Sequence, residues 1–473
     1  MSVTQPRPQS TPSGPAPGSV RGIVGLLVLF ELTSGFLQGG ITPLIPAIRD
    51  MLGISPGAAQ WITAVQFLSA AVCVPAFGRL GDRYGHRLML RVALACVTAG
   101  STLVALAPDV TLLLAGRVLL GPLAALLALE IGLCRDRLGP QASRRAVGLL
   151  VASLVLGSML GSFTTGLLDR LLGGVRPTLW CFAVLAAACV LLSNCRGIPE
   201  TRHKASGRMD WAGAGLLSVA LVLFLAAVSQ GGTRGWSSPG TLAGLTTALV
   251  LFALWVRWEL RQEHPLVDVR SAAGRAVAPH LASGFALGVV MLAEPVVAVS
   301  YLDAAPETTG YGFGLAAWQI GLWGGIPHLA GFLTAAASAS VAARIGLRRM
   351  LVLAFGLVAA GNTALVATHS SLHGFALAYA VAGAGTGLAS GGLPTVIVEA
   401  SPADRSASAV AVHNNLKTLG GSIAGAAFAA ILGTLLADGT TTPALSAYLT
   451  VWALCAVVTT TALLLTLLAP RRD

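Results

Sequence analysis

Three carboxylates inside long apolar stretches are the residues of this chain best placed to do chemistry. Of its 19 Asp and Glu residues, only Glu31, Glu130 and Glu294 fall within such stretches. An ionised carboxylate in the middle of a bilayer costs at least about 2.5–3.5 kcal/mol, so each of them is a functional candidate. Because burial disfavours the charged form, such a group can take a proton from one side of a membrane and release it on the other. We therefore predict that these acids carry protons or contact a substrate.

Arg117 and Lys417 are the two basic residues inside apolar stretches. Arg keeps its proton, so a buried guanidinium needs a partner, and Glu31 is the acid that we expect at the same depth. Gln38 lies seven residues after Glu31 and shares its helical face. Lys417 belongs to a polar cluster with His413; it either contacts substrate or extends its ammonium group towards the membrane surface. We add Gln38, Arg117 and Lys417 to the predicted proton or substrate cavity.

Two of the acids also have a structural interpretation. Glu130 lies a few residues from the end of its apolar stretch, close to Arg135 and Arg137, so a salt bridge at a gate is an equal alternative. Glu294 precedes Pro295, and a proline inside a helix frees a backbone carbonyl and permits a bend. Such a bend suits a helix that moves during gating.

The elements that must position these residues are membrane helices. Charged residues make up 10% of the chain, apolar residues 55%, and the mean hydropathy is +0.78. The apolar runs are roughly 20 residues long, enough to cross about 30 Å of hydrocarbon as a helix, and they lack the alternation of a barrel strand. We predict an all-α membrane protein with 14 transmembrane helices. They lie near 22–48, 57–78, 88–107, 109–134, 145–168, 177–195, 211–230, 240–258, 278–302, 314–342, 349–368, 373–398, 407–436 and 444–468.

The basic residues orient these helices. Of the 30 Lys and Arg residues, 24 fall in the two tails and in the loops on the same side, four fall on the other side, and two lie inside spans. Cytoplasmic loops carry such an excess, so we predict a multi-pass inner-membrane protein with both termini in the cytoplasm. The net charge of +11 is therefore explained without nucleic acid. The seven cysteines show no CxxC pair, and we expect no metal site and no cofactor.

An internal repeat divides the chain. Residues 80–87 follow the second predicted helix, and residues 341–348 follow the tenth at an offset of 261. The matching positions are Arg83 and Arg344, Gly85 and Gly346, and Arg87 and Arg348. We predict a disordered tail over 1–21, a six-helix half over 22–196, a linker with two inserted helices over 197–275, and a second six-helix half over 276–470.

The loop after the second helix carries a motif. Gly78-Arg79-Leu80-Gly81-Asp82-Arg83-Tyr84-Gly85-His86-Arg87 resembles the loop 2–3 signature of the major facilitator superfamily. Gly85 permits a tight turn, and Arg83 and Arg87 suit an anionic inner leaflet. We predict a cytoplasmic gate motif of Gly78, Asp82, Arg83, Gly85 and Arg87. The resemblance implies that Asp82 braces the two halves by contacting residues 403–406; the alternative is a solvated basic turn.

Further segments resemble the drug/proton antiporters of this superfamily that have 14 helices. Gly157, Ser158, Gly161 and Ser162 fall where those proteins have a helix-5 motif, with Ser158 at the position of its proline. Small residues four positions apart let two helix backbones approach closely, so we predict a packing motif, with or without directional meaning. In helix 4, Leu120 stands where the family's second motif has glutamine. The aspartate common in the outer half of helix 1 is missing, and Glu31 lies earlier in that helix.

The resemblance implies a fold of two six-helix halves with two inserted helices, whose helices 1, 4, 9 and 12 line a central cavity. The three acids lie on helices 1, 4 and 9. We predict a monomeric proton-coupled transporter that exports amphipathic drug-like or antibiotic small molecules by alternating access, with protons, substrate and lipid as its partners. The alternative is a proton-coupled uptake symporter for a small metabolite. Since no catalytic constellation or ATP-binding loop is found, we do not expect an enzyme.

Overall fold

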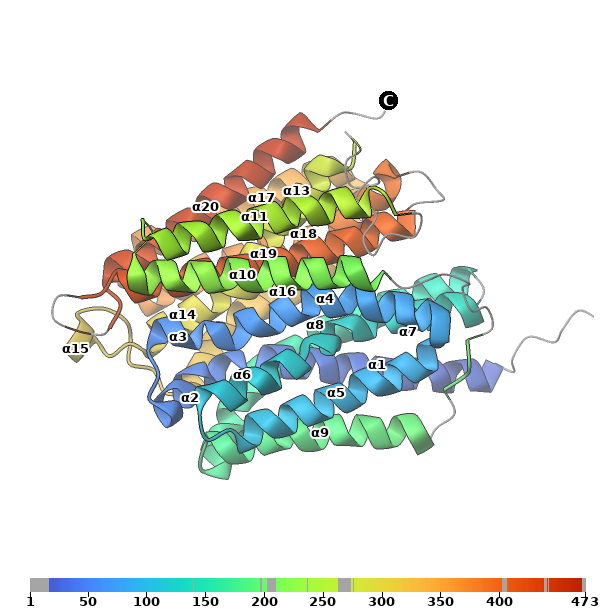
Figure 1. The fold of residues 1–473 in the computed structure, drawn as a ribbon, viewed down its shortest axis with the longest axis horizontal. Helices are drawn as coiled ribbons and strands as arrows, with labels where there is room; N and C mark the ends of the chain where they lie inside the picture. Colours follow the sequence, from blue (N-terminus) through green and yellow to red (C-terminus); the bar gives the residue numbers. More distant parts are fainter. Residues whose placement is uncertain are drawn as a thin grey trace, which may run out of the picture.

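The computed structural model describes residues 17–138, 140–195, 198–201, 210–235, 237–262, 274, 276–401, 406–437, 440 and 442–469. Over these residues it is a bundle of helices that run roughly side by side (Figure 1). Fourteen helical segments of the described chain are long and apolar enough to cross a membrane. They agree with the predicted spans to within a few residues, so the all-α fold and the helix number are confirmed.

Several spans are built from more than one element. The first six spans comprise α1 (Pro17–Gly40), η1 (Thr42–Leu44), α2 (Ile45–Leu52), α3 (Pro56–Ala59), α4 (Trp61–Tyr84), α5 (His86–Leu106), α6 (Val110–Leu119), η2 (Gly121–Ala125), α7 (Leu126–Arg137), α8 (Pro140–Leu172) and α9 (Val175–Cys195). The next two are α10 (Trp211–Arg234) and α11 (Pro239–Glu259). The last six comprise α13 (Ala278–Gly288), η3 (Val289–Ala293), α14 (Glu294–Asp303), α15 (Pro306–Thr309), α16 (Ala317–Ile345), α17 (Leu347–Thr368), α18 (Leu372–Ala400), α19 (Ser406–Thr434) and α20 (Leu445–Leu468).

Proline explains where three of the spans change geometry. The first span breaks at Pro43, the fourth passes through a 3-10 turn at Pro122, and the ninth contains a π-helical turn, η3, before Pro295. Proline has no N–H to donate and its ring crowds the preceding turn, so the regular hydrogen-bond ladder is interrupted at each place. The bend predicted at Pro295 therefore takes the form of a widened turn, a feature frequent at functional sites.

Two apolar cores follow the predicted division into halves. One core joins buried side chains of α1, α4, α5, α7 and α9, and the other joins side chains of α13–α20. Val296 of α14 is the member of the first core that comes from the second half. The predicted domain boundaries themselves stay a prediction.

The two inserted helices lie over the line where the halves meet. α10 and α11 pack against each other, and α10 also packs against α4 of the first half and α19 of the second (Figure 1). A third apolar cluster includes Ala71 from α4, Leu217 and Trp255 from the inserted pair, and Ile397 and Val412 from the second half. The inserted pair thus contacts both halves on one face of the bundle.

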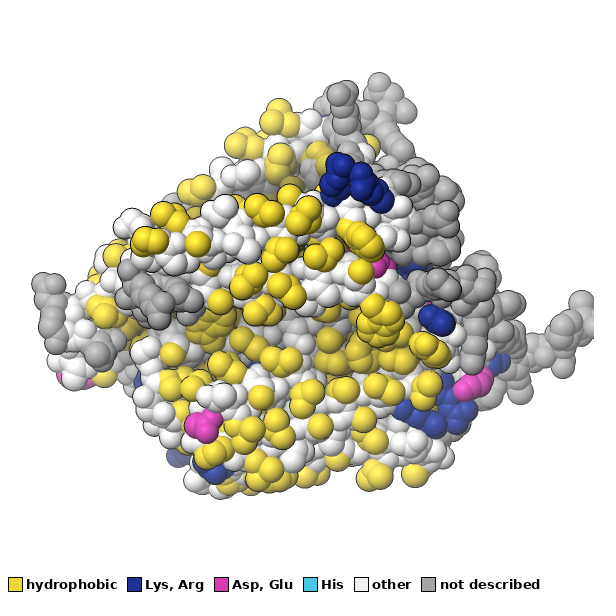
Figure 2. Space-filling view, viewed as in Figure 1, with side chains coloured by type: hydrophobic (Ala, Val, Ile, Leu, Met, Phe, Trp, Pro, Cys, Tyr) yellow, Lys and Arg dark blue, Asp and Glu magenta, His cyan; other side chains and the backbone are white. Residues whose placement is uncertain are grey.

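The two ends of the bundle differ. Basic side chains gather at the end where α4 and α7 finish, which we call the basic end (Figure 2). Near the other end the halves are tightly joined: Arg49 of α2 forms an ion pair of 2.8 Å with Asp303 of α14. Gly57 lies against the backbone of α19, and an added Cβ would be 3.0 Å from a carbonyl oxygen of that helix. Gly166 lies against the start of α16, where an added Cβ would be 2.3 Å from a carbonyl oxygen. We call this set of contacts the seal.

Candidate transport site

Glu31 and Glu130 form an acid pair inside the first half. Their side chains are 1% and 0% exposed. The Ser34 hydroxyl donates to the Leu123 carbonyl oxygen at 3.4 Å, which fixes α1 against the fourth span, and the two carboxyl groups interact electrostatically. In the described part of the chain, one oxygen of Glu31 and both oxygens of Glu130 have no hydrogen-bond partner. Both acids are therefore buried where α1 meets the fourth span, with carboxyl oxygens that the described residues leave unbonded.

Arg117 does not pair with Glu31, and that prediction is wrong for this structure. The ion pairs within 4.0 Å among the described residues do not include it. Its Nε instead donates to the Ile62 carbonyl oxygen at 2.6 Å. Arg117 lies beside Leu37 and Ile41, six and ten residues beyond Glu31. At 1.5 Å per residue these are about 9 and 15 Å further along the helix, so equal depth was a poor estimate.

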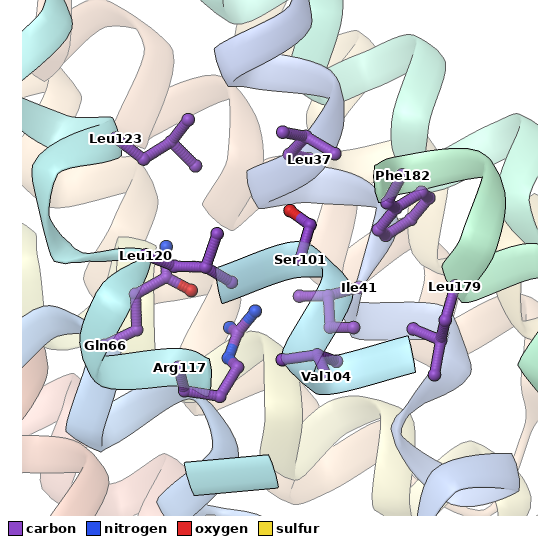
Figure 3. Close-up of a pocket in the computed structure, with 10 residues that line it drawn as sticks. All are labelled: Leu37, Ile41, Gln66, Ser101, Val104, Arg117, Leu120, Leu123, Leu179 and Phe182. Atoms are coloured by element: carbon purple, nitrogen blue, oxygen red, sulfur yellow. The ribbon is translucent and has the colours of Figure 1, made fainter. Parts of the chain in front are cut away.

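A small cavity surrounds Arg117 within the first half (Figure 3). The space between its walls is about 310 Å³, but its widest part holds only about one water molecule. Side chains from α1, α4, α5, α6, η2 and α9 line it: Leu37, Ile41, Gln66, Ser101, Val104, Arg117, Leu120, Leu123, Leu179 and Phe182. Sites for drug-sized ligands are far wider. The structure therefore places Arg117 inside one half and not in a cavity between the halves.

Glu294 lies at the end of the widened turn in the second half. Its side chain is 3% exposed, it interacts with the Tyr379 hydroxyl of α18, and its Oε1 has no hydrogen-bond partner among the described residues. Tyr379 and Pro295 also line a cavity that both halves share. Its first-half residues are Thr42, Pro43 and Ser162, and its second-half residues are Pro295, Ala298, Val299, Leu302, Ile320, Gly324, His328 and Tyr379. A protonatable group thus lies directly beside the space between the halves.

Within the described chain, Gln38 and Lys417 form no hydrogen bond or ion pair with these acids. Gln38 Nε2 donates to the Ser34 hydroxyl at 3.1 Å, one turn back on α1. Lys417 lies on α19, and its backbone packs closely on Gly288. A Cβ added to Gly288 would be 1.8 Å from the Lys417 carbonyl oxygen. His413, one turn before it, is buried against Gly284. Lys417 is thus held where α19 meets α13.

The gate motif forms the turn between α4 and α5. Gly85 has a φ of 110°, which favours glycine. Asp82 is half exposed, with its Oδ1 at 3.3 Å from His86 Nε2. The His86 backbone N–H donates to Thr201 Oγ1 at 2.8 Å, so the segment after the first half rests on this turn. The predicted contact of Asp82 with residues 403–406 falls largely outside the described chain, and the Ser406 side chain is not described.

The helix-5 motif packs against the first helix. A Cβ on Gly157 would lie 2.0 Å from the Leu32 carbonyl oxygen, and one on Gly161 would lie 2.4 Å from that of Phe36. The Ser162 hydroxyl donates to the Gly39 carbonyl oxygen at 3.2 Å. The small residues thus let α8 and α1 touch backbone to backbone.

The Arg49–Asp303 pair was not predicted from the sequence. Arg49 is one of the four basic residues on the less basic side of the predicted topology. The sequence feature that could have indicated this pair is an acidic residue at the end of another helix on the same side, where charged residues are scarce. Arg49 also binds its neighbour Asp50, at 2.7 Å, so two acids share one guanidinium.

Comparison with known families decides what kind of protein this is. The family model described as Major Facilitator Superfamily matches residues 27–425. The chain belongs to this superfamily. Members of this superfamily are transporters, so this chain, with fourteen membrane-spanning helices in its described part, is a multi-pass membrane transporter and not an enzyme.

Its curated relatives include drug and antibiotic exporters. It is 31% identical over 58% of its length to the "Probable actinorhodin transporter" of Streptomyces coelicolor, and this match spans 50% of that protein. It is 26% identical to the "Multidrug resistance protein Stp" of Mycobacterium tuberculosis, over 83% of this chain and 71% of the relative. It is 28% identical to the "Tetracenomycin C resistance and export protein" of Streptomyces glaucescens, with the same two shares.

Solved structures share the fold. The nucleoside transporter NupG superposes with a TM-score of 0.63 at 12% identity, covering 96% of this chain and 100% of that one. An inward-open structure of the xylose transporter XylE from E. coli gives a TM-score of 0.63 at 13% identity, covering 93% and 95%. At these identities the likeness concerns the fold alone.

Proposed function

We propose that this transporter exports amphipathic drug-like or antibiotic molecules in exchange for protons. Two relatives are named for the antibiotics that they transport or resist, actinorhodin and tetracenomycin C. The observation that carries the proton part is Glu294, a fully buried carboxyl group whose hydroxyl partner, Tyr379, lines the cavity shared by both halves. A group in that position can change its protonation when the halves separate and water reaches it.

The acid pair of the first half supplies a second proton store. Glu31 and Glu130 share a buried site and cannot both be charged, so a change in their exposure releases a proton. Proton release from either half would change the balance between the states of the transporter, because each state exposes different acids. We assign proton coupling to Glu31, Glu130 and Glu294, and we assign no part in it to Arg117.

The charge distribution supports a cytoplasmic basic end. Loops on that side carry most of the Lys and Arg, and such loops stay in the cytoplasm. Both termini then lie in the cytoplasm of a cell whose inner membrane holds the protein. The seal at the opposite end is formed, so this structure corresponds to a state closed towards the outside. Export requires the seal to open after the basic end has closed.

The proposal is tested in inside-out membrane vesicles that contain the full-length protein. Addition of a tetracenomycin-type aromatic polyketide to energised vesicles should release protons, measured by the recovery of a pH-sensitive dye. Glu31→Gln and Glu294→Gln should each reduce the rate of proton release roughly tenfold or more, while the protein stays folded. Glu307→Gln, which changes an exposed acid of α15, is the matched control. Normal proton release in both buried variants would refute the proposal.

The same vesicles distinguish export from uptake. An exporter accumulates labelled substrate in inside-out vesicles when their interior is acidic, whereas an uptake symporter loses substrate from them under the same gradient. The second outcome would favour the alternative of a metabolite symporter on the same fold.

The gate motif has its own test. We propose that Asp82 leaves His86 and binds near the start of α19 when the basic end closes. Asp82→Asn should then hold the protein open at the basic end and slow transport, with little change in substrate affinity. Labelling of a cysteine placed on the cytoplasmic side of the cavity should rise. Unchanged labelling with normal transport would leave this loop as a solvated basic turn.

A further inference from the structure

The proposed transport cycle does not use the cavity around Arg117. Its three polar side chains, Arg117, Gln66 and Ser101, are each 4% exposed. In Figure 3 Gln66 and Arg117 lie side by side at one edge of the cavity, and Ser101 lies between them and the apolar side chains of the opposite wall. Unlike an ordinary apolar packing gap, this cavity contains a charge.

That charge has no acidic partner in the described part of the chain. Among the described residues, no ion pair within 4.0 Å involves Arg117, and its Nε donates to the neutral carbonyl oxygen of Ile62. Arg does not lose its proton in proteins, so the positive charge stays. A buried charge without a counter-charge is strongly unfavourable. The buried acids of this half, Glu31 and Glu130, interact with each other, and Glu31 lies about 9 Å along its helix from Leu37, which lines the cavity.

We propose that the cavity binds a small monatomic anion, with chloride as the physiological ligand. Three kinds of donor surround it: the guanidinium N–H groups of Arg117, the hydroxyl of Ser101 and the amide of Gln66. The Gln66 Oε1 atom has no hydrogen-bond partner among the described residues. Because the two ends of an amide can exchange places by rotation, Gln66 can turn its NH2 group towards an anion.

The size and the lining of the cavity select the ion. Its widest part holds about one water molecule, so a halide ion, which is wider than water, enters when the flexible side chains of Arg117 and Gln66 shift slightly. Sulfate, phosphate and organic carboxylates have several heavy atoms and do not fit. The remaining lining is apolar, with Leu37, Ile41 and Phe182 among its members, so it offers nothing that repels an anion. Through its three donors, binding connects α4, α5 and α6 of the first half and should stabilise that half independently of transport.

The test uses purified full-length protein in detergent. Thermal unfolding is measured in sodium chloride, bromide, gluconate and sulfate at one ionic strength. Chloride and bromide should raise Tm by roughly 2–4 °C in a saturable way, and gluconate and sulfate should not. Ser101→Ala should raise the half-saturating chloride concentration about three- to tenfold. Arg117→Gln should remove the effect. Arg91→Gln, which changes an arginine bound to the Ser193 carbonyl oxygen, is the matched control and should keep it.

Crystals grown with bromide provide the second measurement. An anomalous peak within hydrogen-bonding distance of the Arg117 guanidinium supports the proposal. Equal Tm in chloride and gluconate together with no such peak overturns it and shows that the cavity holds water. A saturable chloride effect of unchanged strength in Ser101→Ala and Gln66→Leu also overturns it, and this readout remains if Arg117→Gln does not fold.

Discussion

The two halves carry related cavities with different chemistry. Four positions that line the cavity of the first half have counterparts in the cavity shared with the second half. The counterparts, separated by 261 or 262 residues, are Leu37 and Ala298, Ile41 and Leu302, Gln66 and His328, and Arg117 and Tyr379. The repeat seen in the loops therefore extends to these cavity walls.

The two cavities differ in whether their polar side chains can gain or lose a proton. The first cavity holds a guanidinium that stays charged and is enclosed by helices of one half. The second cavity has Tyr379 and His328, adjoins Glu294 and borders both halves. One repeat thus has a fixed charge inside one half, while the other has titratable groups beside the space between the halves. The acid pair of the first half lies away from its cavity: Glu31 comes six residues before Leu37, and Glu130 comes seven residues after Leu123.

The largest expected effect comes from removing the two repeat-related polar groups. Arg117→Ala leaves a larger cavity and removes the hydrogen bond from Arg117 to the Ile62 carbonyl oxygen, so the free energy of unfolding should fall by about 2–4 kcal/mol. Tyr379→Phe removes one hydroxyl and should cost about 1 kcal/mol. Thermal unfolding in detergent measures both. Equal losses would show that the two cavities are energetically alike.

A double-mutant cycle examines the acids. Glu31→Gln and Glu130→Gln should show a coupling of about 1 kcal/mol in unfolding free energy, because changing either one relieves the same repulsion. Glu130→Gln combined with Glu294→Gln should be additive, since those residues belong to different cores. Additivity in the first cycle would mean that Glu31 and Glu130 act independently.

Exchanging repeat-related residues should have a smaller effect. His328 Nδ1 lies 3.1 Å from the Gly324 carbonyl oxygen, and a glutamine amide can replace that contact. His328→Gln should therefore reduce unfolding free energy by less than about 1 kcal/mol and keep proton coupling in vesicles. Loss of coupling in this variant, with coupling intact in Gln66→His, would add His328 to the proton path.

The smallest effect is expected at the seal. The Arg49–Asp303 pair is partly exposed, and such pairs contribute about 0.2–1 kcal/mol. Asp303→Asn should shift the population of the outward-accessible state by no more than about fivefold. Labelling of Thr42→Cys from outside, with the exposed Cys181 and Cys195 replaced, reports the shift. Asp50→Asn is the control and should change labelling less. An effect of a hundredfold would make this pair the main lock.

The fold could be predicted from the sequence because the length of an apolar segment and the basic residues beside it determine the span and orientation of each helix on its own. The site depends on how helices rotate and slide against one another, which residue counts do not record. Arg117 and Glu31 illustrate this: both lie in mid-helix, yet the fourth span passes through a 3-10 turn and places Glu130, not Arg117, beside Glu31. The widened turn before Glu294 and the docking of Thr201 on His86 likewise arise from packing between segments.

The seal has a consequence for how this transporter can change over time. Apart from one ion pair, its closest contacts described here involve backbone atoms facing glycines, as at Gly57 and Gly166. Backbone atoms are the same whatever side chains surround them. Substitutions that reshape the cavity for a new substrate therefore leave the closing surface intact, and the substrate range can evolve without a change in these backbone contacts.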